Sequence, residues 1–176
     1  MLVIIDNGKG ANEISSITRA KIATPKSIPK ADAYILSDGI LSKDNQKANV
    51  NLIKCFDKPL LCIGLGSSFL GAAFGAQIKE IKAAKKQERL NLNIPCPLTL
   101  DLKKFFNVVN DSKYTIGNLP DNFNVVASSS GVEFGIIQEM SKPFFGVQFN
   151  PELGGDGIKI LQNFVRFVEI WAKYHK

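Results

Sequence analysis

Short apolar runs alternate with polar turns and amphipathic stretches through the first half of the chain. Runs that are apolar at every position are typical of strands buried on both faces of a parallel sheet. The pattern predicts such strands at residues 2–5, 33–36 and 60–63, with a shorter strand at 21–23. Strands that alternate with helices along the chain indicate an α/β fold.

Helix-like periodicity fills the gaps between these strands. Residues 12–17 predict a short helix, and residues 44–56 predict a longer one that Ser42 or Asp44 could cap. A further helix is expected to begin near Ser67, directly after the strand at 60–63. The apolar face of the longer helix consists of Ala48, Leu52, Ile53 and Phe56.

The second half has a different pattern, with short strands and frequent turns. Strands are expected at residues 89–94, 113–116, 123–127, 134–139 and 144–149. A last helix from Gly157 to about Lys173 carries one apolar stripe, formed by Ile158, Leu161, Val165, Val168 and Trp171. We therefore expect one α/β domain over residues 1–176, with a mostly parallel sheet and an antiparallel section in its second half.

Composition narrows the class of protein. The chain has 176 residues, 45% of them hydrophobic and 22% charged, which is ordinary for a globular domain. Its apolar runs are far too short to cross a bilayer, and the first residues lack a signal-peptide pattern, so we expect a cytoplasmic protein. Three cysteines without metal-ligand spacing and a single histidine disfavour a metal site, and no cofactor is indicated.

The net charge is +6, and four basic residues, Lys82, Lys85, Lys86 and Arg89, are crowded into one basic segment, residues 82–89. A basic segment can bind nucleic acid or an acidic partner. No aromatic residue is interleaved with these side chains, which disfavours binding to a single strand. A solvated surface is the favoured interpretation, and nucleic acid is not expected as a partner.

The most informative feature is the turn after the strand at 60–63. Gly64, Leu65 and Gly66 form a tight Gly-x-Gly turn that leads into Ser67 and Ser68 at the start of a helix. A sharp strand-to-helix turn of this kind presents a catalytic nucleophile at its tip. The tip here is Gly64, which has no side chain. Two alternatives remain for this segment: an anion site formed by backbone N–H groups at the helix start, and a plain tight turn.

Several segments resemble the class I glutamine amidotransferases, and among them the glutaminase subunit of archaeal guanosine monophosphate synthetases. Residues 34–40 are similar to that family's Ser-Gly-Gly-Pro loop, and residues 58–66 to the stretch that carries its nucleophilic cysteine. Residues 119–127 resemble the family's Leu-Pro-x-x-Phe segment. Residues 145–152, Phe-Gly-Val-Gln-Phe-Asn-Pro-Glu, match the signature Gly-x-Gln-Phe-His-Pro-Glu except at one position. The resemblance covers nearly the whole chain and implies a flavodoxin-like fold of three layers.

The family hydrolyses glutamine with a Cys-His-Glu arrangement, and the resemblance implies where its members fall in this chain. The cysteine position is Gly64, the histidine position is Asn150 and the glutamate position is Glu152. An asparagine cannot exchange a proton near neutral pH. Cys62 is expected to be a small buried side chain, and His175 lies on the terminal segment, so neither substitutes for the lost groups.

These losses predict a catalytically inactive amidotransferase-like protein that binds or regulates a synthetase-type partner, such as the synthetase subunit of a guanosine monophosphate synthetase. The alternative is a hydrolase, or a protein that binds a small molecule or an anion, with changed specificity in the same pocket. The candidate binding residues are Gly39, Gly64, Leu65, Gly66, Ser67, Ser68 and Gln148.

Overall fold

A nine-stranded mixed sheet forms the centre of the protein. The computed structural model describes residues 1–82 and 85–175, so Ala83 and Ala84 of the basic segment lie outside the described residues. The strand order is β3-β1-β4-β6-β13-β12-β11-β8-β9. The pairs from β3 to β13 are parallel, and the pairs from β13 to β9 are antiparallel. This confirms the α/β fold with a mostly parallel core and an antiparallel second half.

The parallel strands are short, and except for Lys21 of β3 and Gly146 of β13 they consist of apolar residues. They are β1 (Leu2–Ile5), β3 (Lys21–Ala23), β4 (Ala33–Leu36), β6 (Leu60–Ile63) and β13 (Phe144–Val147). The antiparallel strands are β8 (Lys86–Leu92), β9 (Phe105–Asn110), β11 (Phe123–Ser128) and β12 (Ile136–Glu139). Two small sheets pair β2 (Gly8–Lys9) with β5 (Asp38–Gly39) and β7 (Ile78–Glu80) with β10 (Tyr114–Ile116).

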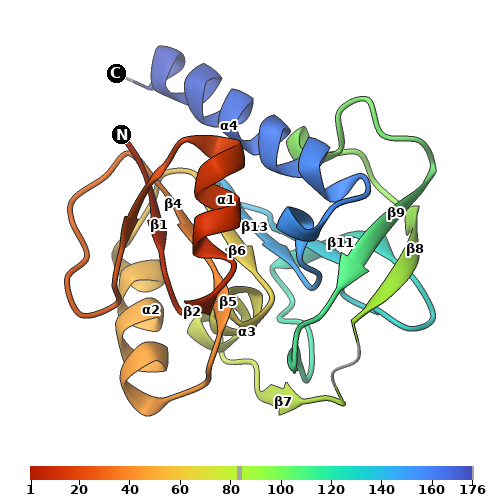
Figure 1. Ribbon diagram of the computed structural model, residues 1–176, viewed down its shortest axis with the longest axis horizontal. Coiled ribbons are helices and arrows are strands. Elements are labelled where there is room, and N and C mark those ends of the chain that lie inside the picture. Colours follow the sequence, from red (N-terminus) through yellow and green to blue (C-terminus); the bar gives the residue numbers. More distant parts are fainter. Residues whose placement is uncertain (83–84, 176) are drawn as a thin grey trace.

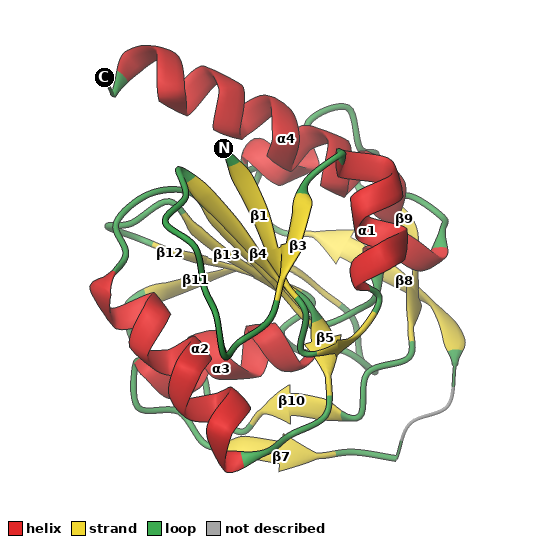
Figure 2. Ribbon diagram, turned by 60° about the vertical axis from the view of Figure 1, so that its left-hand side comes forward, coloured by secondary structure: helices red, strands yellow, loops and turns green. Residues whose placement is uncertain are grey.

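Helices cover both faces of the sheet and make three layers (Figures 1 and 2). Helices α1 (Ala11–Thr18) and α4 (Gly157–Tyr174) lie on one face, and α2 (Lys43–Cys55) and α3 (Leu65–Ala73) lie on the other. The alternation of side chains along each strand produces two cores: Ile4 and Ile35 pack with Ile14 of α1, whereas Val3 and Leu36 pack on the other face. The described residues also form two short 3-10 helices, η1 (Pro97–Thr99) and η2 (Pro151–Leu153).

Some expected elements are shifted. Helix α3 begins at Leu65 rather than near Ser67, because Gly64 is its N-terminal cap residue. The strand expected at 89–94 runs from Lys86 to Leu92, and its residues 86–91 pair with β9. The strand at 105–110 was not expected, because Asn107 interrupts its apolar run, and β7 is too polar to be recognised without its partner β10.

The apolar face of α4 also differs from the expected stripe. Leu161 is buried, but the other fully buried apolar side chains are Ile160 and Phe164, while Val165 and Trp171 are only partly covered. The second half of α4 extends past the edge of the body, so its apolar side chains have less to pack against (Figure 1). Ser42 caps α2 as expected, since its Oγ accepts a hydrogen bond of 3.1 Å from the N–H of Asn45.

The carboxyl ends of the parallel strands meet at one edge of the sheet. Ser37 and Asp38 follow β4, Gly64 follows β6, and Gln148 and Asn150 follow β13. Open α/β sheets bind their ligands at this edge. Among the described helices, none combines the length and apolar character that a membrane crossing requires. The described residues also contain no cluster of three histidine, cysteine or acidic side chains that could hold a metal ion.

Candidate functional site

The turn at Gly64 keeps the backbone shape of a nucleophile elbow. Gly64 has φ 55° and ψ −113°, a conformation that residues with a side chain adopt only under strain. Its N–H donates to the carbonyl of Val147 at 2.8 Å, which ties the elbow to β13. The sequence therefore placed the elbow correctly, with glycine at its tip.

The space beside Gly64 is occupied by the carboxyl group of Asp38. A Cβ atom added to Gly64 would lie 2.5 Å from both Cγ and Oδ1 of Asp38, far inside van der Waals contact. Asp38 is 1% exposed, although it is ionisable. The buried carboxyl group of Asp38 thus fills the space that the side chain of any other residue at position 64 would need.

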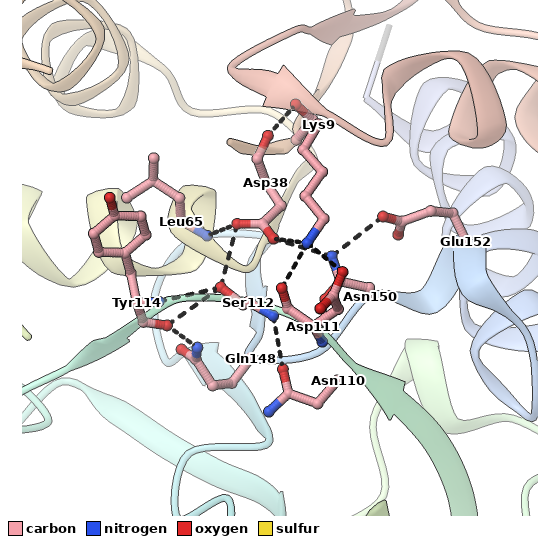
Figure 3. A network of polar contacts seen from close by, with 11 residues as sticks. Lys9, Asp38, Leu65, Asn110, Asp111, Ser112, Tyr114, Gln148, Asn150 and Glu152 are labelled. Atoms are coloured by element: carbon pink, nitrogen blue, oxygen red, sulfur yellow. Dashed lines mark hydrogen bonds and ion pairs between the residues drawn. The ribbon is translucent and has the colours of Figure 1, made fainter. Parts of the chain in front are cut away.

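Four groups contact this carboxylate (Figure 3). Oδ1 accepts hydrogen bonds from the N–H of Leu65 at 2.8 Å and from Oγ of Ser112 at 3.2 Å. Oδ2 accepts from Nδ2 of Asn150 at 3.1 Å and lies 3.7 Å from the Lys9 ammonium. A buried charge needs such partners, because an unpaired carboxylate in a protein interior is strongly unfavourable.

Lys9 and Asn150 connect the carboxylate to a wider network. Lys9 also pairs with the Asp111 carboxylate at 2.7 Å and donates to the Asp111 carbonyl. Asn150 is 0% exposed, and its Oδ1 accepts from the N–H of Asp111 at 2.8 Å. Its Nδ2 donates to Oε1 of Glu152 at 3.3 Å as well as to Asp38. Asn150 thus joins two carboxyl groups, a task that its amide can do without moving a proton.

Glu152 lies in η2, 7% exposed, and its Oε2 is buried without a hydrogen-bond partner among the described residues. The pKa of this carboxyl group is raised from its ordinary value of 4.5 to about 7. Burial is the main cause and the charge of Asp38 adds to it, whereas the backbone N–H of Glu152, the Asn150 amide and Lys9 act in the opposite direction. Much of Glu152 is therefore protonated at neutral pH.

This raised pKa makes the stability of the protein depend on pH. The folded state holds the proton more tightly than the unfolded chain, so the contribution of Glu152 is complete below about pH 4.5 and is lost as the pH rises through 7. We expect the free energy of unfolding of the wild type to fall between pH 5 and pH 8 by on the order of 3 kcal/mol from this group. Glu152→Gln should remove that part of the dependence.

Urea unfolding at a series of pH values measures this effect. Glu13→Gln, on the exposed part of α1, is the matched control and should leave the pH dependence as in the wild type. Parallel pH profiles for the wild type and Glu152→Gln would show that Glu152 does not titrate in this range.

A pocket of about 520 Å³ opens beside the network. Lys9, Asp38, Gly39, Asp111 and Tyr114 are in its wall. Gly64 is buried and does not line the pocket, whereas Asp38, whose carboxyl group lies against Gly64, does. The pocket therefore contains charged side chains of both signs, with Asp38 in its wall.

The predicted binding residues separate into two groups. Gly39, Gly64 and Leu65 lie around Asp38, close to Asn150 and Glu152. Gly39 approaches the backbone of Asn7 so closely that a Cβ atom would overlap it, which explains a glycine there.

The remaining predicted residues do not reach the pocket. Ser67 and Ser68 are 0% and 1% exposed within α3, and neither hydroxyl has a partner among the described residues. Gly66 packs against Leu36, where a Cβ would lie 2.5 Å from the carbonyl oxygen. The Gln148 side chain is buried and donates to the carbonyl of Tyr114. Cys62 is 0% exposed, and burial raises the pKa of its thiol well above the ordinary range, as expected of a packing residue.

Sequence reasoning missed the residues at the centre of the site: Lys9, Asp38, Asp111 and Ser112. One signal was present. Asp38 is a charged residue two positions after a fully buried strand, inside the loop that resembles Ser-Gly-Gly-Pro, where the family pattern has glycine. The partners of Asp38 could not be found, since they lie 27 to 112 positions away in the chain.

Comparison with known proteins is consistent with this architecture. The family model for class I glutamine amidotransferases matches residues 5–167. A GMP synthase subunit from Methanococcus aeolicus, glutamine-hydrolyzing by its name, is 29% identical over 94% of this chain and 96% of its own length. GMP synthase from Nitrobacter hamburgensis is also 29% identical over 89% of this chain, but the chain spans only 30% of that protein.

A solved structure has the same fold. The crystal structure of a Thermoplasma acidophilum protein assigned as a GMP synthase subunit superposes with a TM-score of 0.88, covering 98% of this chain and 96% of that one, at 22% identity. Identity at this level supports the shared fold alone.

Proposed function

The chain belongs to the class I glutamine amidotransferase family, and we propose that it is a member without glutaminase activity. The observation that carries the proposal is at the elbow: its tip is Gly64, and the room for a side chain is taken by the Asp38 carboxyl group. Glutamine hydrolysis by this family's chemistry needs a nucleophile at that point and a base beside it.

The position expected for the base supports the same conclusion. Asn150 donates both to Asp38 and to Glu152, and it has no titratable group to accept a proton from a nucleophile. Losing the nucleophile or the base of such a catalytic unit costs on the order of 10⁶ in rate, nearly as much as losing all of its members. Glu152 then serves as a partner of Asn150 and no longer orients a base.

We further propose that the protein, as one domain, acts in the cytoplasm by binding a synthetase-type subunit. The relatives that are named as one subunit of GMP synthase support this assignment, because such a name implies a partner subunit. A fold retained around a site without its reactive groups is what a binding or regulatory role requires.

Glutamate release from glutamine by the purified protein tests the loss of activity. We expect no release above the buffer blank, with and without the synthetase subunit of the same organism. The Methanococcus aeolicus relative is the positive control under identical conditions. Release of glutamate at a rate proportional to protein concentration would overturn the proposal. The partner role is tested separately, by co-elution of the two subunits in size-exclusion chromatography.

A second candidate function is ligand binding in the 520 Å³ pocket, which the charged side chains of Lys9, Lys113 and Asp111 favour. This function would use the opening in front of Asp38 and not the elbow behind it. Shifts of the Lys113 and Tyr114 amide resonances on titration with a small amino acid would distinguish it from a role in protein binding alone.

A further inference from the structure

Asp38 has the contacts of a bound ligand. Its carboxylate is 1% exposed, and each of its oxygens is contacted by two groups: the Leu65 N–H and the Ser112 hydroxyl on one, and Asn150 Nδ2 and the Lys9 ammonium on the other. Charge-assisted contacts of this kind are stronger than those between neutral groups. Three hydrogen-bond donors and one ammonium group around a carboxyl group are the contacts that a binding site makes with a carboxylate ligand.

The contacting groups come from four separate parts of the fold. Lys9 is in β2, Leu65 is the first residue of α3, Ser112 lies between β9 and β10, and Asn150 follows β13. Figure 3 shows them converging on the Asp38 carboxylate from different sides. The N–H of Leu65 is the group that follows the tip of the elbow, and in an active hydrolase a group in this position stabilises a negatively charged oxygen. Asp38 therefore places a carboxyl oxygen where an active site would develop a negatively charged oxygen transiently.

The loop that carries Asp38 holds it in this place. Ser37 Oγ accepts from the N–H of Asn7 at 2.9 Å, and the N–H of Ile40 donates to the carbonyl of Asn7 at 3.0 Å. Gly8 and Lys9 of β2 pair with Gly39 and Asp38 of β5. These contacts hold the backbone on both sides of Asp38 against residues 7–9, and they fix the position from which its side chain contacts the elbow.

We infer that these four groups form a carboxylate-binding cradle, that Asp38 is its internal ligand, and that this ligand excludes external carboxylates and carboxamides from the elbow. The inference deepens the proposed loss of hydrolysis, on which it rests, by naming what the site now recognises. The hydrogen bond from Ser112 to Asp38 also joins the segments around residues 37–41 and 110–114 at the pocket, without substrate.

Rescue by a small carboxylate tests the cradle. Asp38→Gly removes a group of the size of acetate, so acetate should fill the space and contact the same four groups. We expect Asp38→Gly to melt several degrees below the wild type, and about 100 mM acetate to raise its melting temperature by several degrees in a saturable way at constant ionic strength. Neutral acetamide, of the same shape, and chloride should give less than a third of this rise. The wild type should not respond.

Asp38→Asn is the matched control, because it keeps the size of the side chain but removes its charge. We expect it to be destabilised and unresponsive to acetate, since the space is filled. Equal stabilisation of Asp38→Gly by acetate and acetamide would overturn the inference, as would a melting temperature of Asp38→Asn equal to that of the wild type. The second measurement stands even if Asp38→Gly does not fold.

These outcomes are independent of the glutaminase assay. Glutamate release by the wild type would overturn the proposed function, whereas a failure of acetate rescue with an inactive wild type would overturn only the cradle.

Discussion

Gly64→Cys combined with Asn150→His is expected to destabilise the protein and to leave it without glutaminase activity, although it replaces both lost catalytic groups. The Cβ of the new side chain would lie 2.5 Å from the Asp38 carboxyl group, at a residue whose φ is 55°. Strain and overpacking together should cost on the order of 3–5 kcal/mol. Denaturant unfolding measures this loss.

A third substitution should relieve the overlap. Asp38→Gly empties the space beside the elbow, so the triple variant Asp38→Gly, Gly64→Cys, Asn150→His is expected to recover most of the stability that the double variant loses. It is also the smallest set of changes that gives the elbow a nucleophile, a base beside it and room for glutamine. We expect glutamate release from this variant alone, with Asp38→Gly as the inactive control.

The stability measurement is decisive for the structural claim. A double variant as stable as the wild type would mean that Asp38 does not occupy the space beside Gly64. A stable triple variant that releases no glutamate would mean that substrate contacts elsewhere in the pocket have also been lost.

Asn150→Asp is expected to have the second largest effect. Its Oδ1 would still accept from the N–H of Asp111, but the group that donates to Asp38 at 3.1 Å and to Glu152 at 3.3 Å would become an oxygen. Three carboxyl groups would then meet in a buried site. Breaking a buried charged network in this way costs about 3–5 kcal/mol.

The loss should depend on pH in a definite direction. The new carboxyl group and Glu152 can each take a proton as the pH falls, and the pKa of Glu152 is already raised to about 7. The repulsion should therefore be smaller near pH 5 than near pH 8. Asn110→Asp is the matched control: Asn110 is buried, and its Oδ1 accepts from the N–H of Ser112, a contact that aspartate keeps. A loss for Asn150→Asp that is equal at both pH values would contradict the network.

Local patterns in the sequence were sufficient for most of the fold. The strands at residues 2–5, 33–36 and 60–63 were predicted at their observed bounds, because a run that is apolar at every position has few other stable places in a protein of this kind. The strand at 105–110 was missed, since it depends on pairing with β8 and not on its own pattern.

The elbow and its glycine were also determined by the sequence alone, because a turn of this type is made by consecutive residues. Residues 58–66 and 145–152 were sufficient to locate Gly64, Asn150 and Glu152 and to predict that no nucleophile or base remains. What fills the vacated space was decided only by the tertiary structure. Asp38 reaches Gly64 because β4 lies beside β6, and Lys9, Ser112 and Asn150 join it because the sheet brings the ends of distant strands to one edge. Burial and hydrogen bonding of a charge depend on such long-range neighbours, and no local pattern in the chain encodes them.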